Sequence, residues 1–210
     1  MNLPLFYYCQ AIAIILWLVF RKRFNDPYGK MVFVLILVCF IIDVSAYLYS
    51  LILHTSNHWI YNIYYPLLCI LSSWLFYYKG ENRKLLISVI LVFSFFSFYN
   101  FITYPGNNLI TINYLVGSIM VVVFSIRYLL RLLKVEPPVS LATIMHFWIV
   151  MANLLYFTSS SLYMGAINYL LTTQIDSEGI YIQWLVYLPY AVFFILYSIA
   201  IVCHRIPRSK

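Results

Sequence analysis

The chain has 210 residues, of which 64% are hydrophobic, 20% are aromatic and only 9% are charged. A soluble domain of this length carries about 25% charged residues, so the composition excludes a soluble globular protein and predicts an integral membrane protein. The net charge of +7 does not indicate a nucleic-acid-binding protein, because the basic residues are scattered singly and in pairs between apolar runs. No stretch is long or polar enough for a separate soluble domain, so we expect residues 1–210 to form one transmembrane domain.

Seven apolar runs are long enough to be transmembrane helices, since a helix needs about 20 apolar residues to cross about 30 Å of hydrocarbon. They lie at residues 3–20, 31–53, 59–78, 85–103, 109–130, 142–164 and 182–203. The first run has no basic region before it and is followed directly by Arg21, Lys22 and Arg23, which is the reverse of a cleaved signal peptide. We therefore expect an all-α protein with seven transmembrane helices.

The lysines and arginines predict how these helices are oriented. If the N-terminus is outside, all thirteen lie in the inner segments or at the C-terminal end. The outer segments, which include HTSNH, PGNN and the stretch around Asp176 and Glu178, contain none. Cytoplasmic segments of membrane proteins are enriched in these residues. The sequence therefore predicts an N-terminus outside and a C-terminus, from His204 onward, inside.

The segment between the fifth and sixth spans carries a short basic face. Arg127, Arg131 and Lys134 follow one another at i, i+4 and i+7 before Pro137 and Pro138 stop the helix. Such a face suits contact with anionic lipid headgroups on the inner side of the bilayer, and it also suits docking of a cytoplasmic partner.

The sixth span has its own boundary signals. Ser140 is a candidate N-cap, because its hydroxyl can accept a hydrogen bond from the first turn. The helical pattern then continues for longer than a bilayer requires, and Gly165 is expected to mark the point where it leaves the membrane. Residues 166–179 are predicted to form the largest outer loop, partly helical through INYLLTT.

Asp43 is the most costly residue in the spans, because it lies near the middle of the second one. An aspartate at that depth costs about 2.5–3.5 kcal/mol, and such residues face the protein interior or a water-filled cavity. Tyr47, Ser50 and His54 follow on the same helical face toward the outer side. In the other direction this face is apolar, with Cys39 or Phe40, Ile36 and Val32, and on the sixth span Ile149 or Val150. The pattern predicts a pocket that is open on the outer side and closed below Asp43.

Five amide side chains in other spans also lie at the midplane or in the outer half, namely Gln10, Asn62, Asn113, Asn153 and Gln183. Each can form a hydrogen bond that joins two helices, and as a set they favour a shared polar pocket. The last two spans add Tyr156, Ser160, Tyr187 and Tyr190 at helical spacing. Aromatic residues at this spacing equally suit packing or an interfacial belt. We predict that Asp43 touches at least one of Asn113, Asn153 or Tyr187.

Several membrane chemistries lack the residues that they need. A retinal protein requires a lysine in the seventh span, and a haem or zinc site requires more histidines than His146, which is the one histidine within a span. No GxGD, GxSxG or P-loop motif is present. The cysteines form no CxxC pair and lie at Cys9, Cys39, Cys69 and Cys203. We therefore expect no cofactor, no metal site and no enzymatic activity. Asp43 remains a candidate proton carrier, because burial disfavours the charged form of a carboxyl group.

A weak internal repeat pairs spans one to three with spans five to seven. The corresponding positions are Gln10 and Asn113, Asp43 and Asn153, Ser50 and Ser160, Asn62 and Gln183, and Pro66 and Pro189. Both triplets have the same orientation, which gives the parallel 3+1+3 plan that some transporters use. Coincidence is the rival explanation, because helices in membranes have few polar positions.

Two aromatic-rich segments carry a resemblance to a known group, NHWIYNIYYPLLCILSSWLFYY at residues 57–78 and HFWIVMANLLYFTSSSLY at residues 146–163. In them the chain resembles small seven-span integral membrane proteins of Bacteroidota, which are similar to the seven-span sensor regions associated with histidine kinases. The resemblance implies a multi-pass protein of the bacterial inner membrane without an enzymatic domain. In that group an acidic residue often follows the third-span proline, where this chain has Leu67 and Leu68.

These observations lead to one expected function and one alternative. We expect a receptor-like sensor that binds a small-molecule ligand in an outward-facing polar and aromatic pocket and signals through a cytoplasmic or membrane partner, with no role in nucleic-acid binding. The alternative is a small-solute or proton-coupled transporter or channel built from the two three-helix repeats.

Overall fold

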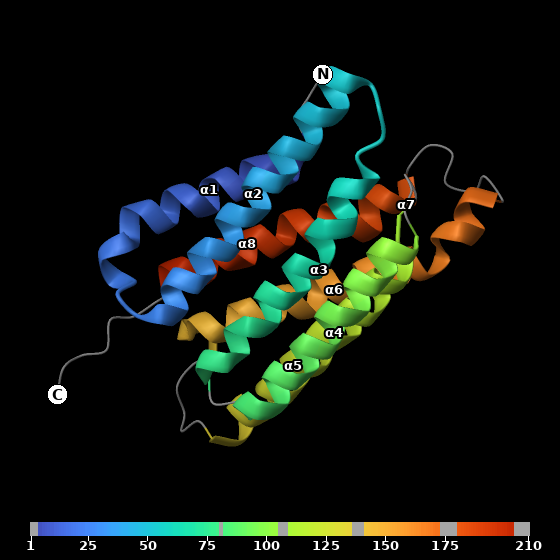
Figure 1. Cartoon of the computed structure of the whole chain (residues 1–210). Coiled ribbons are helices and arrows are strands. Elements are labelled where there is room, and N and C mark those ends of the chain that lie inside the picture. The colour runs from blue at the N-terminus through green and yellow to red at the C-terminus, as the bar shows by residue number, and fades with distance from the viewer. Residues whose placement is uncertain (1–3, 80–81, 105–108, 136–140, 173–179, 204–210) are drawn as a thin grey trace.

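The computed structural model describes residues 4–79, 82–104, 109–135, 141–172 and 180–203. These residues form an all-α bundle in which successive long helices run in opposite directions (Figure 1). The long helices are α1 (Leu5–Phe20), α2 (Pro27–Leu53), α3 (His58–Trp74), α4 (Arg83–Thr103), α5 (Thr111–Val135) and α6 (Met145–Thr172). A 3₁₀ turn at Leu75–Lys79 extends α3. The last long helix combines α7 (Ile180–Ile182), a π-helical turn (Gln183–Tyr187) and α8 (Leu188–Cys203).

Six of the described helices are long and apolar enough to cross a membrane. They span Leu5–Arg23, Pro27–Leu53, His58–Tyr78, Arg83–Thr103, Thr111–Lys134 and Ile180–Cys203. The chain therefore has the make-up of a multi-pass membrane protein. The sixth predicted span is helical in α6 but is not among these six. Its 28 residues are long enough, yet Asn153 and the run from Thr158 to Ser161 make it less apolar than the others.

The start of α2 differs from the predicted one because its capping residue lies before the apolar run, whereas its end at Leu53 is the predicted one. The side chain of Asp26 accepts a hydrogen bond from the backbone N–H of Gly29 at 3.1 Å, and this N-cap starts α2 at Pro27, four residues before the expected position. At the other end His54 takes a left-handed conformation, with a φ of 52°, and caps α2 through a bond to the carbonyl of Ser50. Asp26 and His54 thus set the length of this helix.

The sixth span continues beyond Gly165. Helix α6 runs on to Thr172, so the predicted outer loop at residues 166–179 is helical over its first half, as expected for INYLLTT. The proposed N-cap Ser140 lies outside the described residues.

Six helices form a closed ring, and α4 lies outside it. Each ring helix packs against the next in the order α1, α2, α3, α5, α6 and α8, and α8 closes the ring against α1. Helix α4 packs only against α3 and α5 among the closely packed pairs. Its outward face carries large apolar side chains such as Val92 and Phe95, which are 70% and 73% exposed. Such a face suits lipid, and the buried core lies inside the ring.

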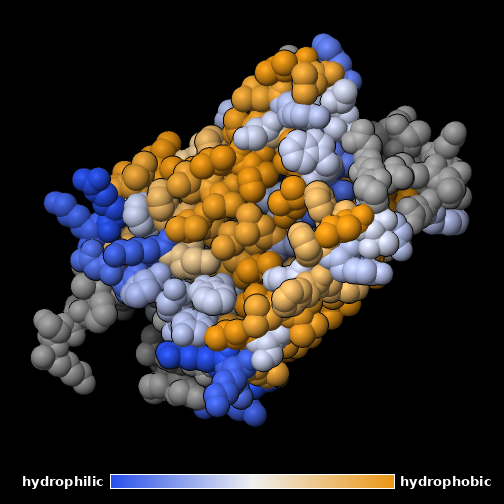
Figure 2. Space-filling model, in the orientation of Figure 1, coloured by the Kyte–Doolittle hydropathy of each residue, from blue (hydrophilic) through white to orange (hydrophobic). Residues whose placement is uncertain are grey.

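Charged side chains gather at one end of the bundle. The described lysines and arginines lie where α1 joins α2, where α3 joins α4 and where α5 ends, and we call this the basic end. The non-basic end is the opposite one, where α2 joins α3 and α4 joins α5. Figure 2 shows hydrophobic residues in orange over the middle of the bundle and hydrophilic residues in blue toward the basic end.

Close packing of α5 against α3 and α4 depends on Gly117. A Cβ atom at this position would lie 2.7 Å from Cys69 Sγ and 2.8 Å from Phe93 Cζ, which is too close for either neighbour. Small residues at helix interfaces in membranes permit such approaches. Gly165, by contrast, has its nearest such neighbour, Leu115 Cδ2, at 3.8 Å.

We predict that Gly117→Ala lowers the free energy of unfolding by about 1–3 kcal/mol, because α5 must move away from α3. Unfolding in mixed micelles titrated with SDS measures this change. The control is Gly165→Ala, which adds the same methyl group without a clash and is expected to leave stability unchanged or slightly raised. Equal effects of the two substitutions would show that the packing at Gly117 is looser than described.

Candidate functional site

A buried carboxylate lies at the centre of the ring. Asp43 is 1% exposed, which confirms the prediction that it faces the bundle interior. Its Oδ2 accepts a hydrogen bond from Gln10 Nε2 at 2.6 Å and another from the Tyr190 hydroxyl at 2.8 Å. The two donors come from α1 and α8, so the bonds join α2 to its neighbour α1 and to α8, which does not flank α2 in the ring.

Further hydrogen bonds extend this cluster. The hydroxyl groups of Tyr64 and Tyr190 bond to each other, and Gln10 Nε2 also lies 3.3 Å from the Tyr190 hydroxyl. The Tyr7 hydroxyl donates to the backbone carbonyl of Asp43 at 3.1 Å. Helices α1, α2, α3 and α8 are thereby tied together. We call the four side chains of Gln10, Asp43, Tyr64 and Tyr190 the Asp43 cluster.

The partners predicted for Asp43 are not its hydrogen-bond partners. Asn113 accepts a bond from Asn100 at 2.7 Å, and Asn153 accepts one from Tyr197 at 3.4 Å. The reason is the ring order, because α2 packs beside α1 and α3, whereas Asn113 and Asn153 belong to α5 and α6. Tyr187 lies in the wall of the same cavity as Asp43.

A cavity of about 660 Å³ lies against the Asp43 cluster. Its wall is largely aromatic and includes Phe6, Tyr61, Tyr64, Tyr114, Tyr156, Tyr163, Tyr187 and Tyr190. Other wall residues lie near the non-basic end, among them Asn57 before α3, His58 at the start of α3, Leu109 before α5, and Ile182 in α7. The cavity therefore extends from Asp43 toward the non-basic end.

Part of the predicted pocket lines this cavity. Asp43, Tyr156, Tyr187 and Tyr190 are in its wall, and Gln10 is bonded to Asp43 behind it. Sequence reasoning missed the wall residues on α1 and α3, above all Phe6, Tyr61 and Tyr64. Nothing in the sequence separates these rings from the rest of the 21 tyrosines and 16 phenylalanines, since each one also suits packing or an interfacial belt.

Four of the other predicted polar residues are buried outside the cavity wall and join helices, and one of them is Asn153, whose bond to Tyr197 is given above. Asn62 accepts a hydrogen bond from the backbone N–H of Ile110 at 2.8 Å, and Asn113 also donates to the carbonyl of Ser97. Ser160 accepts a bond from the Tyr65 hydroxyl at 3.0 Å. These bonds satisfy amide and hydroxyl groups that lipid cannot satisfy. Asn62, Asn113 and Ser160 therefore hold the bundle together beside the cavity.

The other predicted pocket residues lie further out. Gln183 is exposed, because the π-helical turn that it begins adds one residue and rotates the preceding side chains by about 100° relative to a regular helix. Tyr47 and Ser50 are half-buried, and Tyr47 packs its edge against Tyr7. This face of α2 leaves the core because the end of α2 projects beyond the neighbouring helices (Figure 1).

The floor below Asp43 is apolar, as predicted. Val32, Ile36 and Cys39 of α2 are fully buried, and Ile149 and Val150 of α6 are 1% and 2% exposed. Cys39, rather than Phe40, occupies the core face. This packing closes the cavity toward the basic end.

Two helices of the cavity wall contain a proline, and the last one also contains a π-helical turn. Pro189 follows the π-helical turn and lacks the N–H that a regular helix would bond to residue 185. Pro66 lies inside α3, one turn below Asn62. Turns of π-helix occur frequently at functional sites. The π-helical turn places irregular backbone beside the wall residues Tyr187 and Tyr190.

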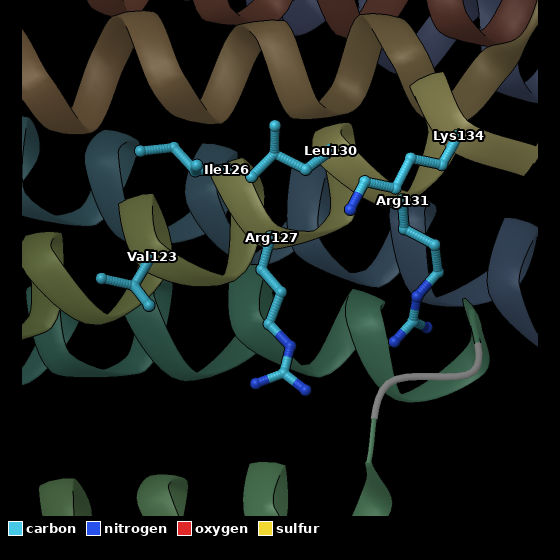
Figure 3. Close-up of a pocket in the computed structure, with 6 residues that line it drawn as sticks. All are labelled: Val123, Ile126, Arg127, Leu130, Arg131 and Lys134. Atoms are coloured by element: carbon cyan, nitrogen blue, oxygen red, sulfur yellow. The ribbon is translucent and has the colours of Figure 1, made fainter.

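The predicted basic face is present on α5 at the basic end. Arg127, Arg131 and Lys134 line a groove of about 540 Å³ together with Val123, Ile126 and Leu130. Figure 3 shows the guanidinium groups of Arg127 and Arg131 on the same side of α5. Arg127 and Lys134 are exposed and Arg131 is half-buried, so this surface can contact anionic groups.

Fold and site together define a multi-pass helical bundle with a buried carboxylate beneath an aromatic cavity. Comparison of the chain with family models, with curated proteins and with solved structures gives no match. Within the described ranges, no group of three or more histidine, cysteine, aspartate or glutamate residues is placed to hold a metal ion.

We predict that Tyr190→Phe lowers the free energy of unfolding by about 1–2 kcal/mol, because it removes the bonds of one hydroxyl to Asp43 and Tyr64 inside the bundle. The same titration with SDS measures this change in the free energy of unfolding. Tyr99→Phe removes a hydroxyl from a side chain that is 66% exposed and serves as the control. A loss no larger than that of the control would mean that the Asp43 cluster contributes no stability.

Proposed function

We propose that the chain is a receptor-like sensor of the bacterial inner membrane that binds a small molecule and signals through a cytoplasmic partner. The observation that carries the proposal is the cavity of about 660 Å³, which leads from the non-basic end to the Asp43 cluster and stops at an apolar floor. Its volume falls within the range of about 300–1,000 Å³ typical of small-molecule sites.

The proposal includes seven membrane spans with the N-terminus outside and the basic end in the cytoplasm. Helix α6 has 28 residues, or about 42 Å of helix, which exceeds the thickness of the hydrocarbon. Two of its polar residues, Asn153 and Ser160, are fully buried inside the ring and so do not face lipid. The one-sided distribution of lysine and arginine supports the orientation.

The Asp43 cluster connects the cavity to helices that extend to the other end of the bundle. The Asp43 cluster joins four helices, so a ligand that contacts it changes the relative stability of two arrangements of those helices. At the basic end, Arg127, Arg131 and Lys134 are suitable contacts for a cytoplasmic partner or for anionic headgroups.

A transporter made of two three-helix repeats is the alternative. The ring order favours it, because α1 to α3 and α5, α6 and α8 follow in succession with α4 outside. The paired positions, however, behave differently. Gln10 binds Asp43, whereas its counterpart Asn113 binds Asn100; Asn62 is buried, whereas Gln183 is exposed.

Access to the apolar floor distinguishes a sensor from a transporter. We predict that cysteines introduced at Ile36 and Ile149 resist a membrane-impermeant thiol reagent from either side, in a protein whose native cysteines are replaced by alanine. A sensor keeps the floor closed, whereas a transporter must open it in one state. Labelling from the cytoplasmic side would support the transporter, and solute movement in liposomes made with the purified protein would confirm it.

The orientation is tested separately. A reporter active only in the cytoplasm, fused after the C-terminus, is expected to be active, because the C-terminal segment carries Arg205, Arg208 and Lys210. The same reporter inserted between α2 and α3 is expected to be inactive. The reverse pattern would place the cavity on the cytoplasmic side and exclude an external ligand.

A further inference from the structure

We propose that the cavity takes a small organic cation, whose ammonium group binds Asp43 and whose carbon body packs against the surrounding aromatic rings. This inference rests on the proposed function, because it names the class of ligand for the same cavity. Four observations carry it: the buried carboxyl group of Asp43 without a cationic partner, its unused acceptor atom, the aromatic wall and the size of the cavity.

Among the described residues, no cationic side chain bonds to the carboxyl group of Asp43. Its bonded neighbours among the described residues are the neutral amide of Gln10 and the neutral hydroxyl of Tyr190. A buried carboxylate requires a positive partner or a proton. The wall residue that can become cationic is His58, but it lies at the start of α3, whereas Asp43 lies ten residues, or about 15 Å of helix, below the end of α2.

The site also has more acceptors than donors. Both side-chain bonds of Asp43 go to Oδ2, and no donor in the described part of the chain bonds to Oδ1, although Asp43 is part of the cavity wall. Gln10 Oε1 is buried beside it and likewise has no partner in that part of the chain. A ligand that brings N–H groups corrects this imbalance, whereas a ligand with only acceptors increases it.

The aromatic composition of the wall favours an organic cation over a metal ion. Phe6 and Tyr156 pack against Tyr190 with ring centroids 5.2 and 4.9 Å away, and Phe6 also lies 5.8 Å from Tyr187. Aromatic faces attract ammonium and guanidinium groups and also pack against carbon. A bare metal ion needs several oxygen or nitrogen ligands, and the wall offers one carboxylate. The volume of about 660 Å³ is also far larger than an inorganic ion requires.

Charge-selective labelling tests the proposal without knowledge of the natural ligand. Met164 is 7% exposed and lies in the cavity wall, so Met164→Cys, in a protein whose native cysteines are replaced by alanine, places a thiol in the cavity. The purified protein in detergent is treated with three methanethiosulfonates that carry a trimethylammonium group, a sulfonate group or a neutral methyl group. Thr55→Cys, at an exposed position outside the cavity wall, corrects for the intrinsic reactivity of the reagents.

After correction, we expect the trimethylammonium reagent to label Met164→Cys about tenfold faster than the sulfonate reagent, or more. The negative charge of Asp43 attracts the first reagent and repels the second, and both effects are strong in a medium of low dielectric constant. Asp43→Asn, which keeps the shape of the side chain, is expected to bring the ratio of the two rates close to one. Phenethylammonium is expected to slow labelling by the neutral reagent, and the uncharged 2-phenylethanol to have little effect at the same concentration.

Two failures are distinguishable. If the neutral reagent labels Met164→Cys but the cationic one has no advantage in the protein with Asp43 intact, the cavity is accessible and the ligand is not a cation, so Asp43 is neutralised by a proton instead. If none of the three reagents labels Met164→Cys while all label Thr55→Cys, the cavity is closed to solution, and the proposed receptor function fails together with this inference.

Discussion

The cost of placing one carboxylate inside an apolar bundle shapes the centre of this protein. Lipid and aliphatic side chains cannot hydrogen-bond to Asp43, so donors have to come from neighbouring helices. Gln10 and Tyr190 supply them, and Tyr64 extends the cluster to a third partner helix.

Much of the fold follows from sequence because hydrocarbon thickness restricts helix length. Runs of apolar residues gave the helical segments, and the ends were displaced where a cap such as Asp26 acted outside the apolar run. The long helix with the lowest hydropathy is α6. Its serines, threonine and Asn153 lower the hydropathy, although Asn153 and Ser160 face the ring interior. Hydropathy counts polar residues without regard to the face that they occupy, so it does not separate polar residues that point into a bundle from those that point outward.

Only those features of the site that depend on a single helix could be predicted from the sequence. Helical periodicity identified the burial of Asp43 and the apolar floor of Val32, Ile36 and Cys39, since these depend on one helix. The partners of Asp43 depend on which helices are neighbours in the ring, and the apolar sequence carries little information about that order. The π-helical turn shifted Gln183 out of the core, and a single inserted residue of this kind leaves no signal in hydrophobic periodicity.

The position of α4 outside the ring has a consequence for how the two halves of the chain are oriented. Successive helices alternate in direction, so α1 and α3 run the same way. Helix α4 returns the chain to the end where α3 began, and α5 therefore also runs in the direction of α1. A chain that lacked α4 would enter α5 from the other side of the bundle. The basic residues of α5 would then lie at the end of the bundle opposite to that of Arg21 and Arg23. Helix α4, which contributes least to the core, therefore keeps the basic residues of both halves at one end of the bundle.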